Sequence, residues 1–193
     1  MELYLVRHGE TEWNKEGRYY GYSNVCLSEE GVAQAKMLGK FLKNISFDKV
    51  ICSPLCRAVD TAKELTDIEL IREKRLMEQN FGQFEGKTYK ELLNQYPKEL
   101  QSWNEDHENF RIPEGESFSD VRLRVESFLE DLKNETGKIL IVAHKGTLGH
   151  MLAAMMHLPL SGYWNFVFEQ GTYSKVDLED GFAILRMINR LPA

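Results

Sequence analysis

The chain has 193 residues and a formal net charge of −6 at pH 7, a length that suits one domain rather than two full ones. Its 42% hydrophobic and 28% charged residues exclude a disordered chain. No apolar run approaches the roughly 18 residues of a membrane span, and the first residues are too polar for a secretory leader. Because an acidic chain repels nucleic acid, an anionic partner must meet local positive charge.

Three cysteines, Cys26, Cys52 and Cys56, give an odd number with no Cys-x-x-Cys pair. This usage predicts neither a disulfide framework nor a zinc site, and it fits a reducing compartment. We therefore expect a cytoplasmic protein with no nucleic-acid partner and no membrane partner.

The chain begins with an alternation of strand and helix patterns. Residues 3–6 form an apolar run that predicts a buried strand. Ser28 is a predicted helix N-cap, and apolar residues recur at helical spacing over residues 32–45. Residues 47–52 predict the second strand.

A helix is predicted directly after this second strand. Ser53 suits its N-cap and Pro54 its first position, and the helix is expected to reach about Leu65. Residues 68–71 then predict an edge strand.

The middle of the chain, residues 82–115, is polar and contains aromatic residues, which predicts an insertion over the top of a sheet. Short helices are expected there around residues 89–96 and near Trp103.

The last third returns to clear patterns. Residues 118–132 place apolar side chains along one face of a long helix. Residues 138–143 predict the best-defined buried strand, and a helix is expected over 147–157. Residues 173–178 and 182–187 alternate around a turn and predict a β-hairpin.

These elements together predict an α/β fold: a three-layer sandwich with a mostly parallel central sheet and helices on both faces. We expect a single domain over residues 1–193, with the small helical insertion at about 82–115 covering the active site. In such a sheet the carboxyl ends of the strands open onto one crevice, where ligands bind.

Cationic or titratable side chains follow three of the predicted strands. Arg7 and His8 end the first, Arg57 lies in the first turn after the second, and His144 follows the strand at 138–143. Adjacent strand residues point to opposite faces, so Arg7 and His8 can share a site only if the backbone turns there, for which Gly9 is suited. Two arginines and two histidines around one point suit a phosphate dianion.

The chemistry of such a site needs a nucleophile and an acid. A neutral imidazole can attack phosphorus to form a phosphohistidine, while arginines neutralise the developing charge. The leaving alkoxide needs a proton from a carboxylic acid. The candidates are Glu10, Glu73, Glu78 and Glu85, and spacing alone does not choose among them.

Four motifs in this order resemble those of the histidine phosphatase superfamily, also called the phosphoglycerate mutase-like family. They are Leu-Val-Arg-His-Gly-Glu-Thr-Glu-Trp-Asn at 5–14, Ser-Pro-Leu-Cys-Arg-Ala at 53–58 with Thr61-Ala62, Met77-Glu78 with Gly82 and Glu85-Gly86, and Val-Ala-His at 142–144. The resemblance spans nearly the whole chain and implies a phosphomonoester hydrolase that uses neither a metal nor a cofactor.

The resemblance also implies roles for individual residues. His8 would be the phosphorylated nucleophile, and Glu78 would protonate the leaving oxygen and later activate water. The other implied site residues hold the phosphoryl group (Arg7, Asn14, Arg57 and His144) or line the substrate side (Tyr20 and Gly21). One departure is Lys145-Gly146, where many members carry two glycines, so Lys145 either adds charge near the substrate or points to solvent.

The short chain favours a phosphatase over a mutase. Residues 47–48, 80–82, 164–171 and 185–187 resemble the α-ribazole-5′-phosphate phosphatase branch, which acts in cobalamin biosynthesis. That substrate carries a flat base on which aromatic rings could stack. The candidate rings are Trp13, Tyr19, Tyr20, Tyr22, Trp103 and Phe110.

Three alternatives to this branch remain open. They are a broad-specificity sugar or small-metabolite phosphatase, a phosphoglycerate mutase, and an inactive protein that only binds phosphate esters. In each case the expected partner is a small phosphorylated metabolite, and the chain is a monomer or a homodimer.

Overall fold

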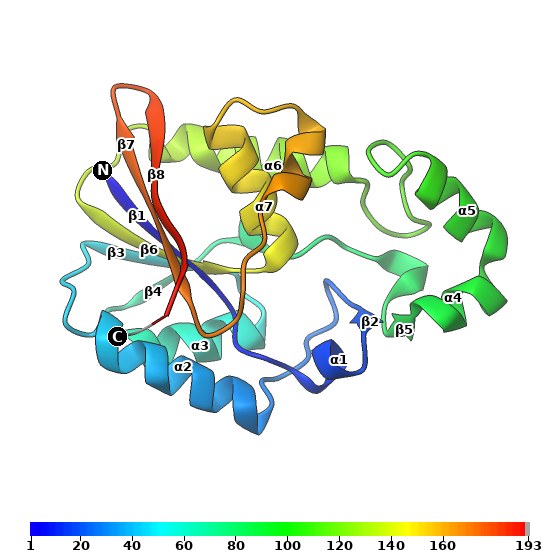
Figure 1. The fold of residues 1–193 in the computed structure, drawn as a ribbon, viewed down its shortest axis with the longest axis horizontal. Helices are drawn as coiled ribbons and strands as arrows, with labels where there is room; N and C mark the ends of the chain where they lie inside the picture. The colour runs from blue at the N-terminus through cyan, green and yellow to red at the C-terminus, as the bar shows by residue number, and fades with distance from the viewer. Residues whose placement is uncertain (192–193) are drawn as a thin grey trace.

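The computed structural model of the protein describes residues 1–191, so the last two residues of the expected 1–193 domain lie outside the description. Its main sheet has six strands in the order β4-β3-β6-β1-β7-β8 (Figure 1). The first four are parallel, and β7 and β8 are added antiparallel to one edge. The six strands are β1 (Glu2–Arg7), β3 (Lys49–Cys52), β4 (Leu70–Arg72), β6 (Lys138–Ala143), β7 (Tyr173–Glu179) and β8 (Phe182–Arg190).

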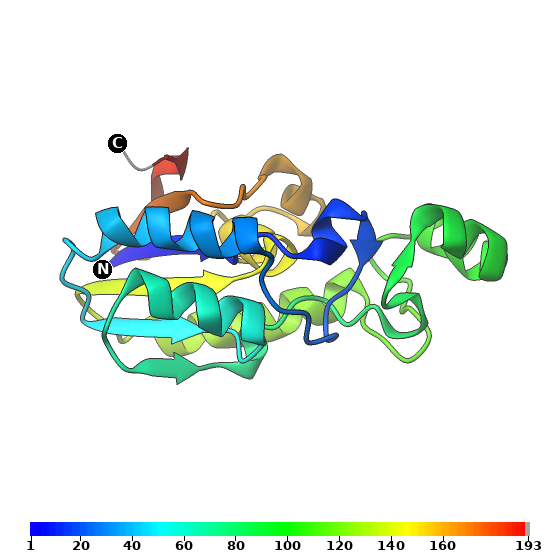
Figure 2. The same cartoon turned by 90° about the horizontal axis from the view of Figure 1, so that it is seen from below.

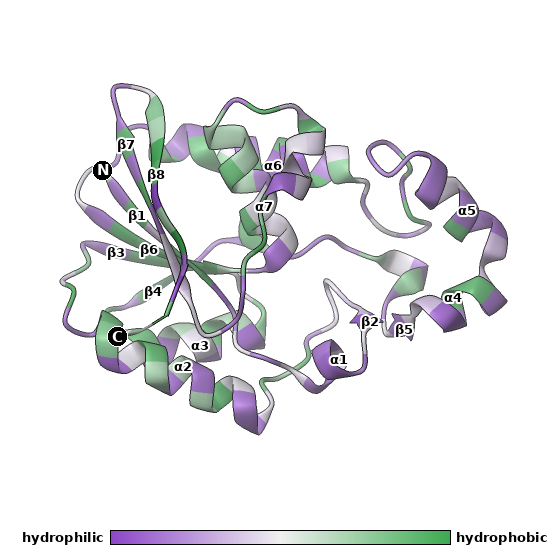
Figure 3. Ribbon diagram, viewed as in Figure 1, coloured by the Kyte–Doolittle hydropathy of each residue, from purple (hydrophilic) through white to green (hydrophobic). Residues whose placement is uncertain are grey.

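Helices cover both faces of this sheet, which confirms the predicted three-layer architecture (Figures 1 and 2). Alternate residues of β1 explain how: Leu3 and Leu5 pack on one face and Tyr4 and Val6 on the other. The four long helices are α2 (Glu29–Leu42) and α3 (Cys56–Leu65) on the Tyr4 face, and α6 (Phe118–Leu132) and α7 (Lys145–Met155) on the Leu3 face. In Figure 3 the middle of the sheet is correspondingly hydrophobic.

The predicted insertion at residues 82–115 projects beyond the sheet (Figures 1 and 2). It packs around its own buried cluster of Phe84, Leu92, Leu100, Trp103 and Ile112. The minor elements of the chain are α1 (Glu12–Lys15), β2 (Arg18–Tyr19), β5 (Lys87–Thr88), α4 (Tyr89–Gln95), α5 (Pro97–Glu105), and the short 3₁₀ turns η1 (Lys74–Leu76), η2 (Gly82–Phe84) and η3 (Leu160–Asn165). Strands β2 and β5 pair into a small second sheet that joins the insertion to the segment after β1.

One predicted helix start is wrong. Helix α3 begins at Cys56 with Leu55 as its N-cap, and no side chain caps it, whereas Ser53 and Pro54 were expected to start it. The Ser53 hydroxyl makes other hydrogen bonds instead: its Oγ accepts from the Leu55 N–H at 3.4 Å and lies 2.8 Å from Nε2 of His144. The predicted N-cap at Ser28 is confirmed, since its side chain accepts a hydrogen bond from the Gly31 N–H.

Strand register brings three strand ends to one edge. Strand β6 lies between β1 and β3, with Ala143 opposite Arg7 and Val142 opposite Cys52. The residues that follow these strands, His8, Ser53 and His144, are therefore neighbours although 136 positions separate the first from the last. Within the described residues, no helix is long and apolar enough to cross a membrane.

Candidate active site

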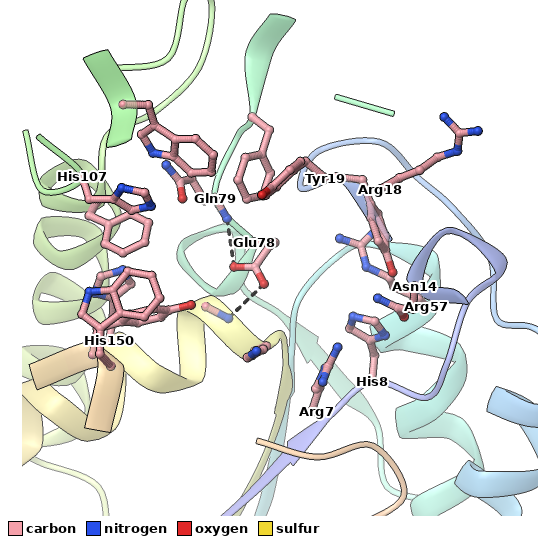
Figure 4. A pocket seen from close by; sticks show the side chains of 18 residues that line it. Arg7, His8, Asn14, Arg18, Tyr19, Arg57, Glu78, Gln79, His107 and His150 are labelled. Carbon is pink, nitrogen blue, oxygen red and sulfur yellow. Dashed lines mark hydrogen bonds between the residues drawn. The ribbon is translucent and has the colours of Figure 1, made fainter. Parts of the chain in front are cut away.

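A cavity of about 330 Å³ opens at this edge of the sheet, within the usual size range for small-molecule sites (Figure 4). Seven of the nine predicted site residues line it: Arg7, His8, Asn14, Tyr20, Arg57, Glu78 and Lys145. Gly21 and His144 do not line it. Instead, the Gly21 carbonyl accepts a hydrogen bond from Arg57, and His144 lies fully buried behind Arg57.

Arg7 and His8 both line the cavity although they are adjacent in the chain. Strand β1 ends at Arg7, and the His8 N–H donates to the Ala143 carbonyl of β6 at 2.9 Å. The expected reason for Gly9 needs correction, because its φ is not among the positive values of the described glycines. A Cβ at Gly9 would instead overlap the Gly31 carbonyl at the start of α2, so close approach of two backbones requires glycine there.

Hydrogen bonds to the two histidines define which nitrogen of each ring carries the proton. Nδ1 of His8 lies 2.7 Å from the Gly9 carbonyl, an acceptor, so Nδ1 carries the proton and Nε2 keeps its lone pair. Nδ1 of His144 accepts from Nε of Arg57 at 3.3 Å, so Nε2 of His144 donates to Ser53. The centroids of the His8 and His144 rings are 5.1 Å apart.

The charge state of His8 follows from its surroundings. Burial, the Arg57 guanidinium and the Arg7 guanidinium, in that order, hold the pKa of His8 well below its usual value. Burial and Arg57 likewise depress the pKa of His144. Both imidazoles are therefore neutral at physiological pH, and His8 presents an unprotonated nitrogen, which is the form that can act as a nucleophile.

Arg7 and Arg57 supply positive charge without a carboxylate partner. Among residues 1–191, neither guanidinium forms an ion pair. Backbone carbonyls hold them instead: Phe168 accepts from Arg7, while Gly21 and Ser23 accept from Arg57. Burial lowers the pKa of both arginines, which reflects the cost of desolvating two like charges. An anion in the cavity relieves this cost, so a net-acidic chain here attracts a dianion.

Asn14 contributes a donor at the same end of the cavity. Its Oδ1 accepts hydrogen bonds from Thr11 and from Nε2 of Gln170, which leaves the NH₂ group of Asn14 to donate to a ligand. Gln170 was not predicted as a site residue, although it lies in a stretch on which the branch resemblance was based. It positions Asn14 from 156 residues away.

The structure separates the four candidate acids. Glu10 contacts Lys15, Glu73 contacts Arg75, and Glu85 accepts backbone N–H groups that shape the loop at residues 21–23. Of the four, Glu78 alone lines the cavity, where it lies between the end with Arg7 and His8 and the opposite wall (Figure 4).

Backbone amides hold the Glu78 carboxylate. The N–H of Gly146, in the first turn of α7, donates to Oε2 at 3.0 Å, and the N–H of Gln79 donates to Oε1 at 3.0 Å. A Cβ at Gly146 would overlap this carboxylate, which explains why glycine stands there. The neighbouring Lys145 is exposed and lines the cavity, and its contribution of charge near the substrate stays a prediction.

Aromatic rings form the other end of the cavity, opposite Arg7 and His8 (Figure 4). We call this end the aromatic recess; it comprises Tyr19, Phe81, Trp103, His107, Phe118, Tyr163 and Trp164. Each ring contacts another member, with Trp103 stacked on His107 at 4.5 Å and Tyr163 edge-on to Trp164 at 4.8 Å. Burial lowers the pKa of His107, so the recess is uncharged at neutral pH.

The predicted aromatic set overlaps only partly with this recess. Tyr19, Tyr20 and Trp103 line the cavity as expected, whereas Trp13, Tyr22 and Phe110 do not. Trp13 packs edge-on against Tyr20, and Phe110 packs on the cluster of the insertion. The predicted set lacked Phe81, His107, Phe118, Tyr163 and Trp164, because these five residues come from four separate segments that only the fold brings together.

Comparison with known proteins gives a consistent result. Residues 3–190 match the profile of the histidine phosphatase superfamily, branch 1. Adenosylcobalamin/alpha-ribazole phosphatase of Salmonella typhimurium is 36% identical, over 98% of this chain and 96% of that protein. Phosphoserine phosphatase 1 of Hydrogenobacter thermophilus is 33% identical over 98% and 92%.

Solved structures show the same relationship. The crystal structure of the alpha-ribazole phosphatase from Shigella flexneri superposes with a TM-score of 0.95 at 34% identity, covering 100% of this chain and 99% of that one.

Within the described residues, no group of three or more His, Cys, Asp or Glu side chains is placed to hold a metal ion.

Proposed function

The chain belongs to the histidine phosphatase superfamily and is a phosphomonoesterase, and from this premise we propose that its substrate is α-ribazole 5′-phosphate. The observation that carries the proposal is the uncharged aromatic recess across the cavity from Arg7 and Arg57. A phosphorylated ribose with a flat base matches a site with an anion-binding end and a stacking end. The similarity to proteins named alpha-ribazole phosphatase supports the same substrate.

In the proposed reaction, Nε2 of His8 attacks phosphorus and forms a phosphohistidine. Arg7, Arg57 and the NH₂ of Asn14 stabilise the equatorial oxygens, so no metal is required to neutralise their charge. Glu78 donates a proton to the leaving ribose oxygen and then accepts one from the water that hydrolyses phosphohistidine.

His144 has two proposed roles in this scheme. The hydrogen bond from Arg57 to its Nδ1 supports it as a positioning residue for the guanidinium. The prediction from the family resemblance, direct contact of His144 with the phosphoryl group, stays a prediction, since the ring does not line the cavity.

We place the reaction in the cytoplasm and in a monomer or homodimer as part of the same proposal. The three cysteines are free thiols, which fits a reducing compartment.

A phosphate-release panel tests the substrate. Phosphate liberated from α-ribazole 5′-phosphate, phosphoserine, 3-phosphoglycerate and fructose 6-phosphate would be measured as kcat/KM under one buffer condition. We expect α-ribazole 5′-phosphate to lead by about tenfold, because stacking in the recess contributes roughly 1.4 kcal/mol beyond the shared phosphate contacts. A sugar phosphate with the highest kcat/KM would reject the proposed substrate, and isomerisation of 3-phosphoglycerate without phosphate release would identify a mutase.

One observation favours phosphoserine as a second candidate. Lys145 lines the cavity and has no ion pair among residues 1–191, so it could bind a substrate carboxylate. The variant Lys145→Met separates the two candidates. It should lower kcat/KM for phosphoserine several-fold if the carboxylate binds there, and it should leave α-ribazole 5′-phosphate nearly unaffected.

A further inference from the structure

Two cysteines lie in contact outside the catalytic cavity. The Sγ atoms of Cys26 and Cys56 are 3.5 Å apart, although 30 positions separate them in the chain. Cys26 is exposed and Cys56 is half-buried, whereas Cys52 is buried in the sheet. A disulfide has an S–S length of about 2.05 Å, so the two sulfurs need to approach by only about 1.5 Å. The pair is therefore placed to form a disulfide, and neither thiol has a part in the proposed reaction.

The same two segments hold Arg57. The loop from Gly21 to Ser28 supplies the Gly21 and Ser23 carbonyls that accept from the Arg57 guanidinium at 2.7 and 2.8 Å. Cys26 lies in this loop, and Cys56 directly precedes Arg57 at the start of α3. Asn24 joins the segments a second time, because its Oδ1 accepts from the Cys56 N–H at 2.8 Å. A change in the Cys26–Cys56 separation therefore moves the loop whose carbonyls accept from Arg57 relative to the helix start that carries Arg57.

We infer that Cys26 and Cys56 form a redox modification site, in which a low-molecular-weight disulfide such as oxidised glutathione converts the pair into an intramolecular disulfide. The new bond draws the loop and the first turn of α3 together and displaces Arg57, which lowers phosphatase activity. Reduction by a small thiol restores it. The site adds a control by oxidation to the phosphatase reaction and does not depend on which phosphate ester is the substrate.

The exchange has a defined order. The thiolate of exposed Cys26 attacks one sulfur of the small disulfide, forms a mixed disulfide and releases one thiol. Cys56 then gives up its proton to solvent, and its sulfur attacks Sγ of Cys26 and expels the second thiol. Two protein thiols are oxidised, and one small disulfide is reduced to two thiols. Burial and the neighbouring Cys26 raise the pKa of Cys56 to about 11, which suits it to the second step rather than the first.

Oxidation of the full-length protein tests this site. The protein would be incubated with oxidised glutathione and alkylated, peptide masses would be determined, and kcat/KM for p-nitrophenyl phosphate would be measured on the same samples. We expect a Cys26–Cys56 disulfide and a fall in kcat/KM of at least about tenfold, since a misplacement of about 1 Å at a catalytic centre can cost about 100-fold. Dithiothreitol should restore the activity.

Single variants separate the two thiols. Cys56→Ser should accumulate a stable glutathione adduct on Cys26, because the second attack is missing. Cys26→Ser should remain unmodified and keep its activity in oxidant, because Cys56 does not attack first. Cys52→Ala is the matched control and should behave like the original protein.

The inference is overturned if the original protein stays reduced, if it carries only a glutathione adduct, or if the disulfide form keeps its full kcat/KM. p-Nitrophenyl phosphate is a general phosphatase substrate, so these outcomes are independent of the α-ribazole 5′-phosphate proposal.

Discussion

The two ends of the cavity are built from different kinds of interaction. Arg7, His8 and Arg57 line one end of the cavity, which we call the phosphate end. Backbone carbonyls accept hydrogen bonds from these three side chains, and such directional bonds fix the atoms that would meet the phosphoryl group. In the aromatic recess, rings contribute by contact with one another, and such packing tolerates exchange of one apolar group for another of similar volume.

Because the two ends are built separately, the substrate can change while the reaction at phosphorus stays the same. The phosphate end comes from strand ends and the helices that follow them, which the fold itself fixes. The recess comes from β2, from Phe81 and the insertion that follows it, from the start of α6 and from η3, which all lie outside the main sheet. Substitutions at the first end should therefore affect every phosphate ester, and substitutions at the second should affect only those with a large group.

The largest effect is expected from His8→Ala. Loss of the nucleophile should lower kcat/KM by about 10⁴-fold or more for every ester, because, of the described histidines that line the cavity, only His8 lies at the end with Arg7 and Arg57 (Figure 4). Phosphate release and trapping of a labelled phosphoenzyme would be measured. His157→Asn serves as the control, since His157 is exposed and Asn tolerates its positive φ. Activity retained in His8→Ala would remove His8 from the mechanism.

Glu78→Gln should lower the rate by about 10² to 10⁴-fold for alkyl phosphates, whose leaving alkoxide needs a proton. The loss should be much smaller for p-nitrophenyl phosphate, because its leaving group departs without protonation. Gly146→Ala should cause a smaller loss of the same pattern by pushing the carboxylate away. Equal losses for both kinds of ester would show that Glu78 does not act as the acid.

Trp164→Ala tests the recess alone. Trp164 is 59% exposed, so its removal should leave the fold intact. The kcat/KM for α-ribazole 5′-phosphate should fall by about tenfold, from the loss of about 1.4 kcal/mol of ring contact, while that for phosphoserine stays unchanged. A parallel loss for both substrates would contradict the division of the cavity into two ends.

The smallest effect concerns stability against pH. His8, His144 and His150 are buried, and burial lowers the pKa of His150 to about 3. Below pH about 6.5 these histidines bind protons in the unfolded chain but stay neutral in the folded protein. As the pH falls, each of them therefore lowers the free energy of unfolding by up to about 1.4 kcal/mol per pH unit.

Urea denaturation between pH 7.5 and 5 would measure this slope. His150→Phe, whose ring fits between Phe118 and Tyr163, should reduce the slope by up to one histidine's share. An unchanged slope would mean that His150 does not stay neutral in the folded protein.

Local patterns in the sequence were enough for most of the fold. The apolar run at 138–143 predicted β6, the helical spacing at 118–132 predicted α6, and Ser28 predicted the start of α2. These features depend on neighbours within a few residues, for which hydrophobic period and capping are reliable guides. The position of Arg7, His8, Arg57 and His144 after predicted strands likewise predicted that they would converge on one crevice.

Tertiary structure decided what depends on distant contacts. Spacing alone left four glutamates as candidate acids and only the family resemblance favoured Glu78; in the fold, Glu78 alone of the four lines the cavity, and the Gly146 N–H in the first turn of α7 donates to its carboxylate. Ser53 was expected to cap a helix, but the fold brought His144 to its hydroxyl. The recess joins Tyr19, Trp103 and Trp164 from three segments, and the Cys26–Cys56 contact spans two more. Such pairings are set by strand order and helix packing, and they leave no periodic trace in the amino-acid sequence.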